Sequence, residues 1–291
     1  MSTAAFDDAP KISLVVCTRN RTKTLPECLT ALGRLRSAVV FEIVVVDNGS
    51  TDDTTAVLQE FASTAQFPVV LVFESRTGLS YARNAGILAA RGDVIAFTDD
   101  DCYPAKDYLD NIMHCFANKN IAYLGGKILL FDPADLPITI QPLNHVVSLP
   151  AGCYLKPGLI QGANFAFRRS VFELVGGFDT QLGAGTPLAS EDVDMTFRAS
   201  MAGLIGTYTP LAVVHHHHRR QTPQDEKEVM RSYALGRGAY FYKGLSSLES
   251  RGIFIWPVLR RLGGHIAFLR FTELRHELQG AFIYRRNRHL L

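Results

Sequence analysis

The chain has 291 residues, of which 47% are hydrophobic and 20% charged, a composition that suits one large α/β domain with a smaller appendage and excludes wholesale disorder. Its five cysteines are odd in number, scattered and never spaced as CxxC, so neither a disulfide framework nor a zinc knuckle is predicted. The net charge of +2 is unevenly distributed, because residues 251–291 carry eight arginines against two glutamates.

The first hundred residues alternate between strand and helix patterns. Short apolar, β-branched runs are separated by segments in which apolar residues recur at spacings of three and four. Strands are expected at 12–17, 42–47, 69–73 and 93–98, and helices at 25–35, 54–61 and 79–91. Such alternation predicts an α/β fold with a mainly parallel sheet and helices on both faces.

The pattern is weaker after residue 102. A helix at 108–116 and an extended segment at 122–131 precede a region that four prolines make irregular up to residue 157. Order returns with a strand at 163–167, a short segment at 171–175, a helix at 191–201 and a strand at 207–214 that ends in four histidines. No apolar run approaches the ~20 residues of a membrane-spanning helix and no signal peptide opens the chain, so we expect a cytoplasmic protein.

Polar side chains follow three of the predicted strands: Thr18-Arg19-Asn20, then Asp47, then Asp99-Asp100-Asp101. In open α/β sheets ligands bind outside the carboxyl ends of the strands, so these groups are expected around one crevice. For Asp47 and the turn residues after it, a plain helix N-terminus is the alternative.

Three consecutive aspartates after an apolar strand repel one another, and a divalent cation would relieve that repulsion. Mg²⁺ or Mn²⁺ prefers oxygen ligands, which Asp99 and Asp101 offer from alternate positions; a solvated loop is the alternative. One of histidines 215–218 could complete such a site. Asp192 is a candidate general base, although acidic residues in the first turn of a helix are also favoured by the helix dipole.

These residues give the chain a resemblance to a known family. In their order and content, six segments resemble the family 2 glycosyltransferases, which have the Rossmann-like GT-A fold. They are SLVVCTRNR, EIVVVDNGSTDDT, GLSYARNAGILAARGDVIAFTDDDCYP, GANFAFRRSVFELVGGFD, SEDVDMTFRA and TPLAVVHHHH, within residues 11–219. The resemblance implies a GT-A domain at 1–220 and a helical, basic extension at 221–291.

The resemblance also implies roles for individual residues. Donor binding falls to Thr18, Arg19, Asn20, Asp47, Arg83, Asp99 and Asp100. Metal binding falls to Asp101, Asp99 and His216, with His215 and His218 as alternatives to the last. Asp192 matches the catalytic base, with Glu191 beside it, and the sugar and acceptor pocket is assigned to Gly162, Ala163, Asn164 and Asp179.

The expected activity is an inverting sugar transfer that depends on Mn²⁺ or Mg²⁺. The donor is a nucleotide sugar, with UDP favoured and GDP or dTDP possible, and the acceptor a glycan or a lipid-linked saccharide of cell-surface biosynthesis. The chain lacks the transmembrane helices and QxxRW element of processive family members, which favours single additions. The alternatives are a nucleotidyltransferase, for which a glycine- and arginine-rich phosphate loop is missing, and a non-catalytic binding module.

The basic tail interleaves arginines with aromatic and aliphatic residues at 253–259 and 266–271. That pattern suits peripheral contact with the inner face of an anionic membrane. Packing against the catalytic domain or against a second subunit is the alternative, so oligomerisation is left open. Nucleic acid is not an expected partner, because no upstream motif supports one.

Overall fold

The computed structural model describes residues 9–287. Within that range the chain forms nine strands and nine helices. In chain order they are β1 (Ile12–Thr18), α1 (Leu25–Gly33), β2 (Phe41–Asp47), α2 (Thr54–Thr64), β3 (Val69–Phe73), α3 (Leu79–Ala89), β4 (Val94–Asp99), β5 (Cys102–Pro104), α4 (Tyr108–Phe116), β6 (Ile121–Leu130), β7 (Val147–Leu149), β8 (Asn164–Arg168), α5 (Arg169–Val175), α6 (Glu191–Met201), β9 (Ile205–His216), α7 (Pro223–Ser246), α8 (Arg251–Ala267) and α9 (Phe271–Asn287).

All the strands between residues 9 and 287 join one sheet, in the order β3-β2-β1-β4-β8-β6-β9-β5, with β7 also paired to β9. Strands β1 to β4 are parallel to one another. Strand β8 runs antiparallel to both of its neighbours, β4 and β6, and β9 is parallel to β6. Strands β1, β4 and β9 therefore end at the same edge of the sheet.

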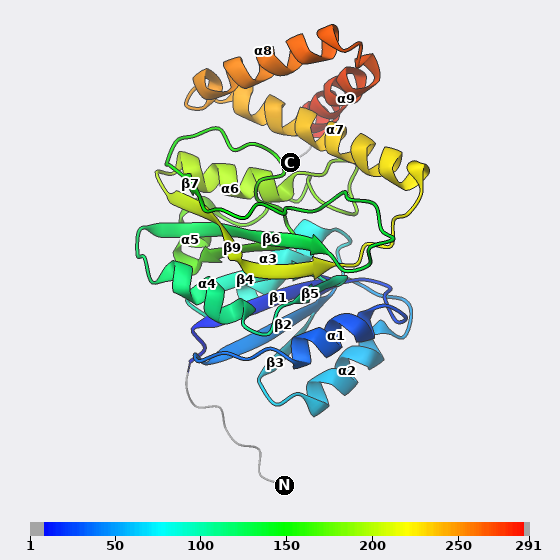
Figure 1. Ribbon diagram of the computed structural model, residues 1–291, viewed down its shortest axis with the longest axis vertical. Helices are drawn as coiled ribbons and strands as arrows, with labels where there is room; N and C mark the ends of the chain where they lie inside the picture. Colours follow the sequence, from blue (N-terminus) through cyan, green and yellow to red (C-terminus); the bar gives the residue numbers. More distant parts are fainter. Residues whose placement is uncertain (1–8, 288–291) are drawn as a thin grey trace.

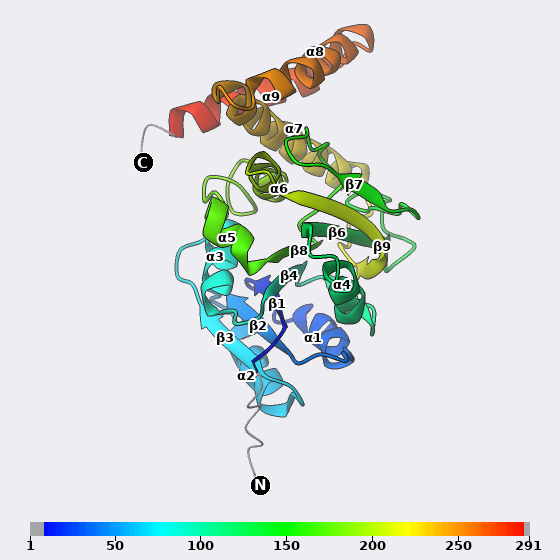
Figure 2. The same cartoon turned by 90° about the vertical axis from the view of Figure 1, so that its left-hand side faces the viewer.

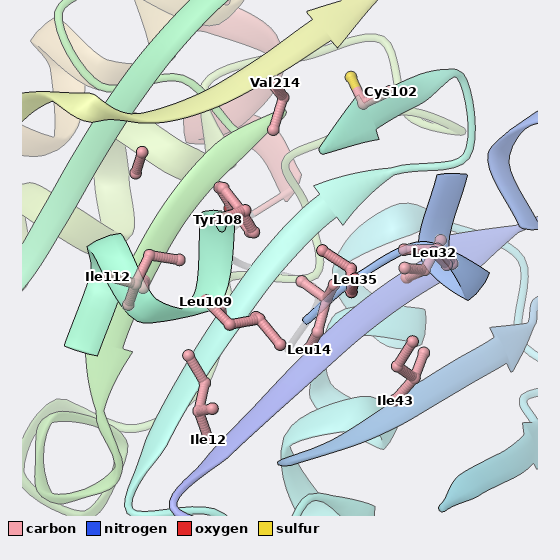
Figure 3. Close-up of a cluster of buried hydrophobic side chains, with 14 of the residues drawn as sticks. Ile12, Leu14, Leu32, Leu35, Ile43, Cys102, Tyr108, Leu109, Ile112 and Val214 are labelled. Atoms are coloured by element: carbon pink, nitrogen blue, oxygen red, sulfur yellow. The ribbon is translucent and has the colours of Figure 1, made fainter. Parts of the chain in front are cut away.

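The sheet has a hydrophobic core on each face, because successive strand residues point to opposite sides. Leu14 packs in one core with α1, α2 and α4, part of which Figure 3 shows. Its neighbour Val15 packs in the other core, with α3, α5, α6, the last turns of α7 and the start of α8. Figure 1 and Figure 2 show these helical layers on either side of the strands.

The α/β sheet with helices on both faces, predicted from the alternation of patterns, is confirmed. The sequence did not predict β5 and β7, which have three residues each and exist only by pairing with the distant β9. It also did not predict that β8 inserts antiparallel between β4 and β6. Neither feature has a local signal, because both depend on partners far along the chain.

The last three helices pack on the sheet domain and on one another. Helix α7 begins with a capping box between Thr222 and Asp225, and its buried Tyr240 lies in the same core as α6. Helices α7 and α9 approach closely at Gly238 and Gly280, where a Cβ atom would overlap the backbone of the other helix. None of the helices between residues 9 and 287 combines the length and the hydrophobicity that crossing a bilayer requires.

Asp194 and Arg198 lie one helical turn apart in α6, a spacing that is typical of a surface ion pair. The pair exists, with an N–O distance of 2.9 Å, but Asp194 is buried and also contacts Lys243 of α7 at 2.5 Å. Its charge helps to attach α7 to the sheet domain.

Candidate active site

A cavity of about 900 Å³ opens where β1, β4 and β9 end. Its other walls are the segment before β8, the loop that precedes α6, the first turn of α6 and one side of α7. Parallel strand ends and a helix N-terminus are the usual surroundings of a ligand in an open α/β sheet. The cavity therefore lies where the sequence predicted the crevice.

The three consecutive aspartates at the end of β4 have different partners. Asp99 accepts a hydrogen bond from Arg83 at 3.2 Å, and Asp100 accepts one from the Thr18 hydroxyl at 2.7 Å. Asp101 contacts His216 of β9 at 3.2 Å. Burial raises the pKa of Asp100 to about 6 and also raises the pKa of Asp99. The repulsion inferred from the sequence is thus partly relieved by protein groups.

The contact between Asp101 and His216 is well placed to hold a metal. The Nδ1 of His216 lies 3.2 Å from both the carbonyl oxygen and the hydroxyl oxygen of Thr139, and Nε2 faces Asp101. Burial would lower the pKa of His216, but Asp101 raises it above its ordinary value. Burial raises the pKa of the neighbouring Cys102 thiol far above its usual range, so that thiol stays neutral. The carboxylate oxygen suits Mn²⁺ and Mg²⁺, and the imidazole nitrogen suits Mn²⁺-like and softer ions.

Arg83 connects the strand ends to α6. Its buried guanidinium donates to Glu191 at 2.7 Å, to Asp99 at 3.2 Å and to the carbonyl oxygen of Gly162 at 3.1 Å. Burial alone would lower its pKa, but the charges of Glu191 and Asp99 raise it. Most donors of Arg83 are occupied by protein acceptors, so it orders the site around it.

Asp192 lies in the first turn of α6 and faces the cavity. Its two carboxylate oxygens accept hydrogen bonds from the backbone N–H groups of Gly162, at 2.8 Å, and Val193, at 2.7 Å. Burial and the neighbouring charge of Glu191 raise the pKa of Asp192 to about 7. Glu191 itself is bonded to Arg83. The two adjacent acids therefore differ, and Asp192 is the one poised to exchange a proton near neutral pH.

Most of the predicted site residues line this one cavity. They are Thr18, Arg19, Arg83, Asp99, Asp100, Asp101, Gly162, Ala163, Glu191, Asp192 and His216. Of the four histidines, 216 is the one that meets the aspartates, while His218 is paired with Asp135 at 3.7 Å.

Four predicted site residues lie outside the cavity lining. Asp47 accepts hydrogen bonds from the Ser50 N–H at 2.8 Å and from the Thr55 hydroxyl at 2.5 Å, which is the helix-start arrangement considered as its alternative. Asn20 joins the same turn by accepting from the Thr51 N–H. A base contact by either residue stays a prediction.

Asn164 and Asp179 are also engaged elsewhere. Asn164 is buried in the sheet, where its amide donates to the carbonyl oxygens of Lys127 and Ala212. Asp179 is bonded to Lys243 at 2.7 Å and to the Tyr284 hydroxyl at 2.6 Å. It therefore attaches α7 and α9 to the sheet domain and does not shape the pocket.

The cavity wall that α7 contributes was not predicted from the sequence. Arg220 just before this helix, and Tyr233 and Arg237 one turn apart within it, line the cavity. Arg237 is held by a 2.7 Å hydrogen bond from its Nε to Glu277 of α9. The sequence signal for this wall is the spacing of four between Tyr233 and Arg237, which places both side chains on one face of a helix. The sequence does not indicate that this face of α7 packs over the cavity.

The comparisons with known proteins agree with this geometry. Residues 13–176, more than half of the chain, match the family described as Glycosyl transferase family 2. The chain belongs to this family.

The chain is also similar to individual curated proteins. It is 26% identical over 200 residues to the glycosyltransferase AglE of Haloferax volcanii, a match that covers 68% of this chain and 64% of AglE. It is 28% identical over 196 residues to the O-antigen chain rhamnosyltransferase WbaN of Salmonella anatum, covering 64% and 59% of the two chains. The matches thus span about three fifths of these curated relatives.

The fold is similar to that of a solved mannosyltransferase. The mannosyltransferase PcManGT from Pyrobaculum calidifontis, in complex with GDP-Man and Mn²⁺, superposes with a TM-score of 0.65 at 19% sequence identity. The match covers 98% of this chain, including α7 to α9, and 81% of that chain. The GT-A-like architecture followed by C-terminal helices is thereby confirmed.

Proposed function

We propose that this protein is an inverting, metal-dependent glycosyltransferase that moves a sugar from a nucleoside diphosphate sugar to an acceptor hydroxyl. The observation that carries the proposal is that one cavity holds two complementary groups. Asp192 is a half-buried carboxylate with a raised pKa that lines the cavity, and the contact between Asp101 and His216 offers ligands for a cation. Membership of the family and the sugar-nucleotide complex of PcManGT support the choice of reaction.

Asp192 would act as the general base. Its carboxylate takes the proton of the acceptor hydroxyl, whose oxygen attacks the anomeric carbon while the bond from that carbon to the diphosphate oxygen breaks. The two backbone N–H groups on Asp192 fix its orientation for this task. A retaining double displacement would need a second free carboxylate as nucleophile, and Glu191 and Asp99 are both bonded to Arg83.

Asp101 and His216 would hold the cation, with Asp99 as a further oxygen ligand. When bound, Mn²⁺ or Mg²⁺ supplies positive charge that stabilises the departing diphosphate. Thr139 contacts the Nδ1 of His216 and so orients the imidazole ring with Nε2 toward the site. Arg21, 3.5 Å from Asp100, adds a cation at the same strand ends.

The acceptor would lie between Asp192 and α7. Tyr233 presents an aromatic ring of the kind that stacks on sugars, and Arg237 presents a cation for an anionic acceptor group. The similarity to an O-antigen chain rhamnosyltransferase supports a cell-surface glycan or a lipid-linked saccharide as the acceptor class.

A donor screen tests the proposal. UDP-, GDP- and dTDP-sugars are added with Mn²⁺, first in a thermal-shift assay and then in an assay for release of nucleoside diphosphate. We expect one donor class to stabilise the protein and to be turned over, and the Asp192→Asn variant to keep the shift but not the turnover. Release of pyrophosphate from a nucleoside triphosphate and a sugar phosphate would identify a nucleotidyltransferase, whereas binding without any turnover would identify a binding module.

A further inference from the structure

Helix α8 exposes an apolar stripe to solvent, in addition to the apolar residues that it buries. The stripe, exposed at spacings of three and four, consists of Ile255, Leu259, Leu262 and Ile266, with Trp256 beside it. The inward side carries the buried Phe254 near the start of the helix, and Arg261 and the buried His265 further along. A helix on a water-facing surface is expected to point its apolar side chains toward the protein.

The inward face of α8 is fixed by an ionic network. The carboxylate of Glu277, on α9, accepts a hydrogen bond from Arg261 at 2.9 Å and one from Arg237 of α7 at 2.7 Å. Its other oxygen lies 3.0 Å from the Nε2 of His265. Rotating α8 to hide its apolar stripe would break these contacts within a half-buried region, so the outward orientation of the stripe is built into the fold.

The apolar surface continues past the end of α8. Phe268 and Leu269, at the corner between α8 and α9, are 73% and 74% exposed, and Trp256 is 72% exposed. Phe282 extends the surface along α9 and is also exposed. Figure 1 and Figure 2 place α8 and α9 at the end of the molecule opposite β3, with α7 between them and the sheet. We call this exposed set of residues the α8–α9 surface.

The α8–α9 surface is strongly basic. Residues 251–287 contain seven arginines and two glutamates, and both glutamates, the buried Glu277 and the more exposed Glu273, are paired with arginines. The exposed arginines flank the apolar residues along both helices; they are Arg251, Arg260, Arg270, Arg275, Arg285 and Arg286. Arginine side chains can lay their apolar stems along a lipid boundary while the charged ends stay at the headgroups.

We propose that the α8–α9 surface binds an anionic membrane by lying in its interface. Apolar side chains that enter the headgroup region, flanked by basic residues that meet anionic lipid, are the two components of interfacial binding. Each basic residue near such a surface contributes about 1 kcal/mol. Pairing with a second copy through the same surface would bring the arginines of both copies together. A nucleic acid would match the charge but not the exposed Trp256, Phe268 and Leu269.

Trp256 provides a direct test, because it is the only tryptophan of the chain. Intrinsic fluorescence of the full-length protein is measured with vesicles of phosphatidylcholine alone and of phosphatidylcholine with phosphatidylglycerol, at low and at high salt. We expect a blue shift and quenching by brominated lipid with the anionic vesicles, weaker in high salt and absent with the neutral ones. A spectrum that no vesicle changes would overturn the proposal.

Flotation of matched variants with anionic vesicles tests whether the exposed apolar residues are needed for membrane binding. Replacing Phe268 and Leu269 together by serine should lower the vesicle-bound fraction by tenfold or more. The control is Leu88→Ser, which removes an equally exposed leucine from α3, and it should float as the wild type does. Both variants should keep the wild-type Tm, since exposed side chains add little to stability. Equal flotation of the two variants would contradict the proposal.

Two further readouts separate the other occupants. Light scattering of the lipid-free protein should show a monomer whose mass the double serine variant does not change; a dimer that this variant dissociates would assign the surface to a second copy. A gel shift with RNA or DNA should show only weak, salt-sensitive retardation; tight binding that the double variant leaves intact would assign the charge to nucleic acid. None of these measurements includes a donor sugar, so their outcome is independent of the proposed reaction.

Discussion

Two clusters in different parts of the molecule each pair a carboxylate with a histidine. In the cavity, Asp101 contacts His216 at 3.2 Å; in the helical layer, Glu277 contacts His265 at 3.0 Å. Both belong to groups of side chains close enough to share a metal ion. They differ in what else surrounds the carboxylate.

Glu277 has its oxygens occupied by Arg237, Arg261 and His265, and it is buried away from the cavity. Burial would raise its pKa, but these cations hold it below its ordinary value. Asp101 has a single close ionic partner, His216, and lines the cavity. The comparison shows that the partners of a carboxylate, and not its residue type, decide whether it stabilises the fold or remains available to a ligand.

The largest expected effect is the loss of turnover on changing Asp101. The Asp101→Ala variant should have no detectable transfer and no metal-dependent nucleotide binding, while its Tm stays within a few degrees of the wild type because the residue lies at a strand end. Transfer by the wild type should stop in EDTA and return with Mn²⁺. Near-wild-type activity in EDTA would show that the transfer does not depend on a metal ion.

Changing the proposed base should have the next largest effect. The Asp192→Asn variant should bind the donor within a few-fold of the wild type but transfer at least about 100-fold more slowly, as the loss of a general base does. Single-turnover kinetics with a titrated donor separate the two quantities. Weakened donor binding at an unchanged rate constant would instead make Asp192 a donor ligand.

The helical cluster is expected to affect stability and not metal binding. The Glu277→Gln variant leaves two arginines and a histidine without their shared anion, and it should lower the free energy of unfolding by about 2–3 kcal/mol. Glu273→Gln is the matched control, because Glu273 is exposed and its pair with Arg261 is of the kind worth about 0–1 kcal/mol. If urea denaturation shows the same loss in the free energy of unfolding for both variants, the Glu277 network does not stabilise the fold more than an ordinary surface pair does.

The smallest effect concerns pH. Asp192 must be deprotonated to act as a base, and its pKa is raised to about 7, so kcat/KM should increase by roughly tenfold from pH 6 to pH 8.

The raised pKa of Asp192 has the opposite effect on the stability of the fold. The folded state holds the proton of Asp192 more tightly than the unfolded state does. Protonated Asp192 therefore adds to the free energy of unfolding at low pH, and this contribution is lost as the pH rises through about 7. The Asp192→Asn variant should therefore have the higher Tm at pH 8. A flat activity profile below pH 8 would argue against this base.

The sequence predicted the parts of the fold and site that have local signals. The strand ends at Thr18, Asp99 and His216 were predicted, because a buried strand followed by polar residues forms one continuous pattern in the sequence. The predictions for Asn164 and Asp179 placed at the pocket two residues that the fold uses elsewhere, since a motif does not reveal which way a side chain turns. The α7 wall and the outward direction of the apolar stripe of α8 were not predicted, because both depend on the ionic network around Glu277, whose members are far apart in the chain.

Titration of Mn²⁺ into two histidine variants tests the comparison most directly. The free Mn²⁺ signal is followed by electron paramagnetic resonance, with UDP or GDP present, for the wild type, His216→Ala and His265→Ala. We predict that the wild type and His265→Ala bind Mn²⁺ with the same affinity, and that His216→Ala binds it at least about tenfold more weakly. Equal affinities in all three proteins, or a loss confined to His265→Ala, would contradict the assignment of the cavity cluster as the metal site.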